Sequence, residues 1–210
     1  MSLVLKSAVA SLAVQFIVGG ITLAGFFLDI PDYKRNDITV ILSLEFSSQV
    51  IEFLWYIVTV IRYSEIQTWT RYLDWTASTP VMLISTALFF QHRYEKDLSA
   101  IFLDWPIYAC LAFNWIMLAF GFAAETNFMP RTPALFLGSF AFVGTFTCLA
   151  VPILESDGLS IQLFWTMYTV WGLYGVAAAF PYKPKNVAYN LLDLVSKNFY
   201  GIFLFVYSLT

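Results

Sequence analysis

Charged residues and metal-binding residues are scarce in this chain of 210 residues. Only 12% of the residues are charged, and 11 Lys and Arg against 14 Asp and Glu give a formal net charge of −3. No basic patch is present, so nucleic acid is not an expected partner. The single histidine, His92, lies in the polar link "QHRYEKD", a setting typical of a solvated side chain rather than a metal ligand. We therefore expect no metal site.

Cysteine is also scarce. Cys110 and Cys148 both fall in apolar stretches, where a thiol usually behaves as a small hydrophobic side chain. Two such residues imply no disulfide framework. The first apolar stretch lacks a clean small-residue cleavage site at its end, so we expect it to be a helix of the protein and not a removable signal peptide.

Apolar residues, by contrast, make up 60% of the chain, and aromatic residues 19%. Seven segments can each supply the roughly 20 residues that a helix needs to cross about 30 Å of hydrocarbon. They cover about 7–28, 38–61, 70–90, 98–122, 132–154, 160–181 and 187–209. None has the period of two expected of a strand, and helices satisfy their own backbone in lipid. The sequence predicts an all-α integral membrane protein that is multi-pass, with one seven-helix bundle domain over residues 1–210 and membrane lipid around it.

Charged residues inside the predicted spans are the main functional candidates. A charge near the bilayer centre costs roughly 2.5–3.5 kcal/mol even on a lenient insertion scale, so it is expected to face the bundle interior. The charged residues in the spans are Glu45, Glu52, Arg71, Asp74, Asp104, Asp193 and Lys197. Lys197 lies roughly 15 Å into its helix, at about 1.5 Å per residue. Its amine must therefore be paired or modified where it stands.

Four of these charges are expected to meet. Asp193 precedes Lys197 by one helical turn, and Arg71 and Asp74 are three residues apart on the third segment. One interpretation is a structural ion-pair network that holds the helices together. The other is that Lys197 forms a Schiff base with an aldehyde, since a buried amine is a good nucleophile, with Asp74 and Asp193 as counterions. The residues alone leave both interpretations open.

An aldehyde with a long apolar body would need a slot of aromatic rings. Trp75, Trp165 and Tyr168 lie at matching depths in the predicted helices and are candidates for the walls of that slot. Aromatic residues in membrane helices also serve simple packing.

Three motifs carry a resemblance to a known family. "RYLDWTASTP" at 71–80 and "LDLVSKN" at 192–198 resemble the third- and seventh-helix signatures of microbial (type 1) rhodopsins, and "WTMYTVWG" at 165–172 resembles the sixth-helix signature. The resemblance implies seven helices with the N-terminus outside and the C-terminus cytoplasmic. It also implies all-trans-retinal joined to Lys197 as a Schiff base.

The same resemblance implies a role for each matching residue. Asp74 and Asp193 would be the counterions and Arg71 the gate on their outer side. The pocket walls would be Trp75, Trp165 and Tyr168. Thr79 and Asp104 would form a hydrogen-bonded pair between the third and fourth helices. One departure is Thr169, which stands where many relatives place a proline that kinks the sixth helix.

The position that would donate a proton in an outward pump is occupied by serine. It lies eleven residues after Asp74, on the same helix face, and is Ser85. A serine hydroxyl cannot supply a proton at a useful rate near neutral pH. Efficient pumping is therefore not expected, and a weak light-driven outward proton pump and a sensory photoreceptor are kept as alternatives.

The second predicted helix favours ion conduction. "LEFSSQVIEF" at 44–53 places Glu45, Gln49 and Glu52 on one face, as expected of a wet path that attracts cations. In another interpretation Glu45 reaches the headgroups and Glu52 alone makes a buried hydrogen bond.

A helix-two glutamate and an asparagine after the retinal lysine form the gate of channelrhodopsins, often with a serine of the first helix. Glu52, Asn198 and Ser11 (or Ser7) match this pattern. The chain most resembles the compact viral channelrhodopsins of algal giant viruses, viral rhodopsin group 1. This implies a light-gated channel for small cations or protons, not an enzyme. The sequence is compatible with a homo-oligomer and does not set the oligomeric state.

Overall fold

The computed structural model describes residues 2–62, 67–94, 97–103, 105–151 and 158–209. Within these ranges the chain forms seven long α-helices and two short 3₁₀-helices, and no strand. In chain order they are α1 (Leu3–Gly25), α2 (Asp32–Ile61), η1 (Thr68–Thr70), α3 (Arg71–Arg93), η2 (Leu98–Leu103), α4 (Trp105–Glu125), α5 (Arg131–Ala150), α6 (Gly158–Ala178) and α7 (Tyr182–Ser208). The predicted all-α bundle of seven helices is confirmed.

Among the helices that begin earlier than their apolar stretches, α2 and α7 do so by the largest margin. α2 begins at Asp32 instead of about 38, and α7 at Tyr182 instead of about 187. Pro31 and Pro181 stand immediately before these starts, where a fixed φ suits the entry into a helix. Hydropathy detects only the part of a helix that lies in hydrocarbon, so polar first turns escape it.

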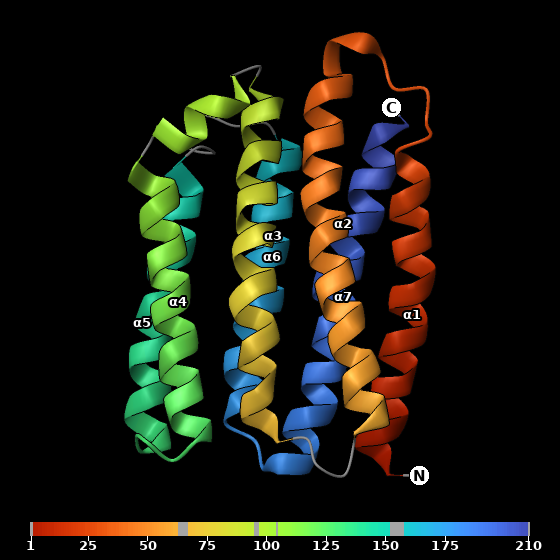
Figure 1. Cartoon of the computed structure of the whole chain (residues 1–210). Helices are drawn as coiled ribbons and strands as arrows, with labels where there is room; N and C mark the ends of the chain where they lie inside the picture. The colour runs from red at the N-terminus through yellow and green to blue at the C-terminus, as the bar shows by residue number, and fades with distance from the viewer. Residues whose placement is uncertain (1, 63–66, 95–96, 104, 152–157, 210) are drawn as a thin grey trace.

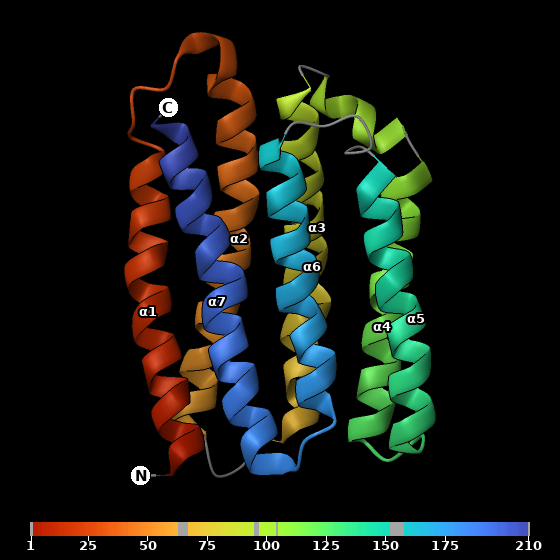
Figure 2. The same cartoon turned by 180° about the vertical axis from the view of Figure 1, so that it is seen from behind.

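The helices run side by side and alternate in direction, as Figures 1 and 2 show, with the two termini at opposite ends of the bundle. α7 packs against α1, α2 and α6, and α4 and α5 form a closely packed pair on the other side. α3, α6 and α7 lie between α1 on one side and the α4–α5 pair on the other, and residues of α2, α4 and α5 also reach the middle of the bundle. The functional site lies there.

Polar residues face inward and apolar residues face outward on α7. The buried side chains of this helix include Asn186, Asn190, Asp193, Lys197 and Asn198. Beyond the first turn its exposed residues are apolar, among them Leu191, Val195, Phe199, Ile202 and Val206. Such an arrangement places charges where other helices can pair them and leaves lipid to contact hydrocarbon.

By length and apolarity alone, four of the described helices qualify as membrane spans, namely α1, α2, α4 and α5. The polar interior faces of α3 and α7 lower their average apolarity. Because these four apolar helices belong to one bundle of seven long helices, the chain is a multi-pass membrane protein.

Glycine allows α4 and α5 to approach aromatic rings closely. A Cβ atom added at Gly121 would lie 2.5 Å from the ring of Tyr72, and one added at Gly144 would lie 2.9 Å from the ring of Phe113. Both distances are far below van der Waals contact, so no larger residue fits without movement.

Candidate functional site

The amine of Lys197 is held between two helices deep in the bundle. Its Nζ lies 3.2 Å from Oδ2 of Asp74 and donates to Oγ of Ser78 at 3.0 Å, both on α3. Oε1 of Glu52, on α2, lies 3.5 Å away. Lys197 is only 2% exposed, and a buried ammonium needs nearby carboxylates to offset its desolvation. The lysine therefore serves as the junction of α2, α3 and α7.

Asp193 belongs to a second pair, one turn nearer the N-terminus of α7 than the first. Its Oδ2 lies 3.1 Å from Nη1 of Arg71. The hydroxyl groups of Tyr56 and Tyr174 each donate to its carboxylate at 2.7 Å. The compact cluster of four charges expected from the sequence is thus divided into two pairs, Lys197 with Asp74 and Arg71 with Asp193.

Amide side chains of α7 complete the binding of Arg71. Its Nε donates to Oδ1 of Asn186 at 3.3 Å, and its Nη2 donates to Oδ1 of Asn190. Asn186 in turn donates to Oγ1 of Thr68 at 2.9 Å. A planar guanidinium with five N–H donors can serve several acceptors at once. Arg71 consequently closes the end of the site that lies toward the N-terminus of α3.

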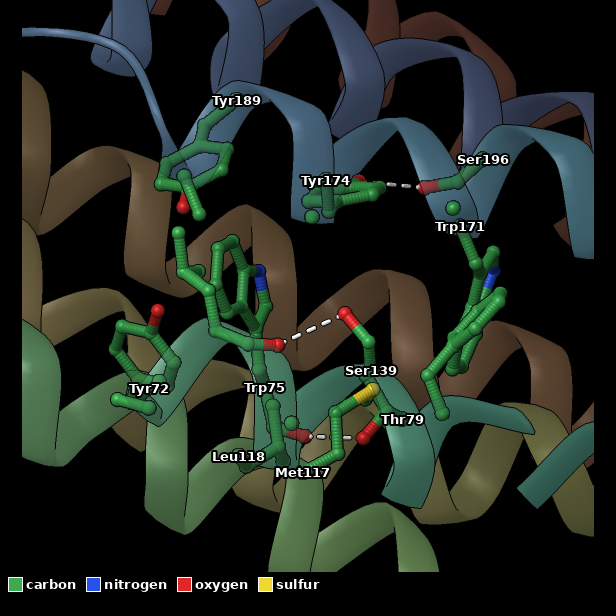
Figure 3. Close-up of a pocket in the computed structure, with 18 of the residues that line it drawn as sticks. Tyr72, Trp75, Thr79, Met117, Leu118, Ser139, Trp171, Tyr174, Tyr189 and Ser196 are labelled. Atoms are coloured by element: carbon green, nitrogen blue, oxygen red, sulfur yellow. Dashed lines mark hydrogen bonds between the residues drawn. The ribbon is translucent and has the colours of Figure 1, made fainter. Parts of the chain in front are cut away.

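An apolar cavity of about 200 Å³ leads away from Lys197. Its aromatic walls are Tyr72, Trp75, Phe142, Trp171, Tyr174 and Tyr189. Figure 3 shows Trp75 and Trp171 on the cavity walls and the hydroxyl of Tyr174 bonded to Ser196. The ring of Trp75 meets those of Tyr189 and Tyr174 edge to face, at 5.0 and 5.4 Å. A slot of aromatic rings that ends at an amine fits an apolar aldehyde.

The sixth-helix walls differ from the prediction. Trp165 is 57% exposed, and Tyr168 packs against Phe142 and Phe146 without lining the cavity. Trp171 and Tyr174 line it instead, so the assignment of Trp165 and Tyr168 is wrong.

The cause of this error is a repeated spacing. A tryptophan followed three residues later by a tyrosine occurs twice on α6, and the two occurrences are six residues apart. At about 100° per residue, six residues rotate a side chain by about 240°, toward a different face. The tyrosine that lines the cavity is Tyr174. The position where many relatives have a proline is therefore Gly175, and the prediction that Thr169 occupies it is wrong.

Thr79 has a partner that the sequence analysis missed. Its Oγ1 accepts from Nδ2 of Asn114 on α4 at 2.9 Å and donates to the carbonyl of Trp75 at 2.7 Å. Asp104, the predicted partner, lies outside the described residues. Asn114 is thus a partner of Thr79 between α3 and α4. Its isolation in the apolar run "LAFNWIML" was the available signal.

The polar stripe of α2 is wholly inside the bundle. Glu45 and Glu52 are both 0% exposed and Gln49 is 3% exposed. Nε2 of Gln49 donates to Oε1 of Glu45 at 3.3 Å. The interpretation in which Glu45 reaches the headgroups is therefore wrong, because its side chain is completely buried.

Ser7 and Ser11 of α1 bond to Asn190, in the N-terminal half of α7. Oγ of Ser11 donates to the carbonyl of Asn190 at 3.2 Å and accepts from Nε2 of Gln15 at 3.3 Å. Ser7 accepts from Nδ2 of Asn190 at 2.8 Å. Asn190 precedes Asn198 by eight residues, about 12 Å along a helix. Ser11 consequently contacts α7 well toward the N-terminal end of that helix from Asn198.

Asn198 and Glu52 do not bond to each other in this structure. Nδ2 of Asn198 donates to the carbonyl of Leu194 in its own helix at 2.9 Å, and Glu52 faces Lys197. The predicted gate of Glu52, Asn198 and Ser11 is thus replaced by three separate interactions.

Several buried oxygens between α1, α2 and α7 have no hydrogen-bond partner among the described residues. They belong to Gln15, Thr22, Glu45, Gln49, Glu52 (both carboxylate oxygens) and Asn198. Buried polar atoms in proteins are normally satisfied, by water where no protein group is available. This series, which we call the polar file, is therefore suited to hold water.

Comparisons with known proteins agree on one family. A family model described as bacteriorhodopsin-like protein matches residues 7–210. Viral rhodopsin OLPVRII is 27% identical, with a TM-score of 0.87 over 98% of this chain and 97% of its own. A blue light-absorbing proteorhodopsin from Med12 is 18% identical, with a TM-score of 0.78 over 99% and 97%.

The light-driven proton pump LR (Mac) from Leptosphaeria maculans is 15% identical, with a TM-score of 0.76 over 99% of this chain and 96% of its own. A search of curated proteins found no match. Because the family model covers nearly the whole chain, this protein belongs to the bacteriorhodopsin-like family, the microbial rhodopsins.

Proposed function

We propose that the protein is a retinal-binding photoreceptor that acts as a light-gated cation channel. The observation that carries the proposal is the polar file, whose unpaired oxygens include those of Glu52, which faces Lys197 directly. Retinal, joined to Lys197 as an imine, would supply light absorption and a change of shape on illumination. The protein's own residues would convert that event into an open path.

Four residues would hold the chromophore. Lys197 would carry the covalent link, and Trp75, Trp171 and Tyr174 would enclose the apolar body. Asp74, at 3.2 Å from the lysine nitrogen, would balance the positive charge directly. Asp193 would act from one turn outward, where Arg71 and two tyrosine hydroxyl groups already share its charge.

The pairing of Glu52 with Lys197 gives a physical reason for gating. A proton that leaves the lysine nitrogen for Asp74 removes the positive charge that faces Glu52. The side chain of Glu52, which has no other described partner, is then free to turn, and water can enter the polar file. Discrete rearrangement of a few such contacts is a common way for proteins to switch.

Carboxylates in the path would select cations. Glu45 and Glu52 lie fully buried on the same face of α2, and rings or rows of acidic groups favour positive ions. We place the N-terminus outside and the C-terminus in the cytoplasm, so that Arg71 guards the outer end. Flow would be passive and would follow the membrane potential.

Voltage clamp of illuminated cells that express the protein tests this proposal. A channel predicts a photocurrent that changes sign as the holding potential crosses the reversal potential, and that shifts when the external cations are replaced. A photocurrent that stays outward at every potential would reject the channel in favour of a pump.

A weak outward proton pump is the second candidate, favoured by the contact between Asp74 and Lys197. The inner donor position argues against efficient pumping. Ser85 donates to the carbonyl of Ile41 and lies 3.3 Å from the hydroxyl of Tyr200, and no carboxylate takes part in these contacts. The same recordings separate the two candidates.

A further inference from the structure

We propose that the cavity opens sideways to the lipid between α5 and α6, and that retinal enters from the bilayer through this opening. The opening, which we call the α5–α6 window, is framed by Gly138 and Ser139 on α5 and by Gly172 and Gly175 on α6. The inference rests on the proposed binding of retinal to Lys197. It adds a route by which the chromophore reaches that lysine.

The window residues face both the cavity and the outside of the bundle. All four line the cavity that contains Lys197. Ser139 and Gly175 are also exposed, and Gly138 and Gly172 are half-buried. Because Ser139 and Gly175 line the cavity and are also exposed, the cavity wall at the window is only one residue thick.

Small side chains leave this wall incomplete. A Cβ atom added at Gly175 would meet no atom within 4 Å, and one at Gly172 would meet only the ring of Phe142, at 3.7 Å. The hydroxyl of Ser139, which Figure 3 labels, donates to the carbonyl of Leu135 at 2.8 Å. The only side-chain hydroxyl of the window is therefore already bonded to backbone, and the opening presents a mainly apolar surface.

The surroundings of the window suit an apolar chain that arrives from lipid. Exposed apolar side chains flank it on both helices, among them Phe136, Phe140, Val143, Leu173 and Val176. α5 and α6 also pack less extensively against each other than α4 and α5 do. A polyene aldehyde partitions into hydrocarbon, so the membrane is the phase that would deliver it.

The outer end of the bundle is closed to such a molecule. There the way to Lys197 passes Arg71, Asp193 and the tyrosine hydroxyl groups bonded to them. An apolar chain moving through this end would have to break charge-assisted hydrogen bonds without replacing them. Entry between α5 and α6 breaks none of these bonds.

The rate of pigment formation tests the route. Retinal-free protein in membranes is mixed with all-trans-retinal, and the rise of visible absorbance is followed. Gly175→Leu and Ser139→Leu should slow this rise about tenfold, which corresponds to about 1.4 kcal/mol in the barrier. The matched control is Gly20→Leu, because Gly20 is exposed on α1 and also has open space around its added Cβ.

A reversible chemical block of the window distinguishes slow entry of retinal from misfolding of a variant. In Gly175→Cys, an apolar disulfide-forming reagent attached to the new thiol should slow loading, and a reducing agent should restore it. The unsubstituted protein, whose own Cys110 and Cys148 are buried, is treated in parallel. Slow loading that is confined to the window variants and reversed by reduction would support the inference.

Equal rates in all variants, or equal slowing by Gly20→Leu, would overturn the window. A protein that stays colourless at every time, unsubstituted protein included, would instead reject retinal binding. The two failures are therefore distinguishable.

Discussion

Oε1 of Glu52 lies 3.5 Å from Nζ of Lys197, so the amine that would carry the chromophore faces the polar file of α2 directly. Both side chains are buried, and neither carboxylate oxygen of Glu52 has a hydrogen-bond partner in the described part of the chain. A change of charge at Lys197 would thus alter the surroundings of Glu52 without an intermediate residue. This contact links light absorption to conduction in the proposed mechanism.

Lys197→Ala should abolish the visible absorption band, because no other amine lies in the cavity among its lining residues. The measurement is the absorption spectrum of purified protein after incubation with all-trans-retinal. Lys6→Ala is the control, since Lys6 is exposed on α1. A coloured Lys197→Ala protein without an added amine would refute the covalent assignment.

Glu52→Gln should change the cation selectivity or the conductance and still form pigment. The substitution removes the carboxylate that faces Lys197 but keeps the shape of the side chain. Photocurrents at several holding potentials, with sodium or potassium outside, measure the effect. Ser47→Ala, on the exposed side of the same helix, should leave the currents unchanged. Unaltered currents in Glu52→Gln would place the path away from α2.

Gly201→Ala should reduce the photocurrent severalfold while the absorption spectrum persists. A Cβ atom at this position would lie 2.0 Å from Nε2 of Gln49 and 2.9 Å from Oγ1 of Thr22, so the amide of Gln49 must move within the polar file.

Gly19→Ala provides a control for the same glutamine, because its added Cβ would lie 4.0 Å from Oε1 of Gln49, an ordinary contact. Equal photocurrents in the two variants would mean that crowding at Gln49 does not affect conduction.

Trp171→Ala should lower the free energy of unfolding by about 3–5 kcal/mol and impair pigment formation, because it removes a large side chain from the cavity wall. Trp171 is 8% exposed, whereas Trp165 is 57% exposed. Trp165→Ala is therefore expected to have a small effect on both properties. Thermal bleaching and the yield of pigment measure the difference. The opposite ranking would restore the register of the sixth helix that the sequence suggested.

Most of the fold was predictable because the constraints on a membrane span are local. Each stretch must be apolar enough and long enough to cross the hydrocarbon, and each charge within it must face other helices. Lys197 and Asp74 could be singled out in this way. Helix ends were less predictable, since the first turn of α2 lies in the polar run "DYKRND".

Contacts between helices were harder to predict. On α6, two identical spacings of tryptophan and tyrosine were equally good matches to the family motif, and only the neighbouring helices decide which pair faces the cavity. Asn114 went unpredicted as a partner of Thr79 because the family resemblance pointed to Asp104, although an amide can also form such a bond. Tyr56 escaped notice because it is an ordinary residue of an apolar helix until its hydroxyl bonds to Asn190 and Asp193 of α7.

The sequence by itself determined that seven helices cross a membrane and that a lysine and several carboxylates lie inside them, because burial in lipid limits each segment separately. The tertiary structure alone decided how those charges divide, with Asp74 beside Lys197 and Asp193 beside Arg71. It also decided that Glu52 faces the lysine while Ser11 bonds to Asn190, nearer the N-terminus of α7. Such pairings depend on the rotation and height of one helix against another, which no single segment encodes.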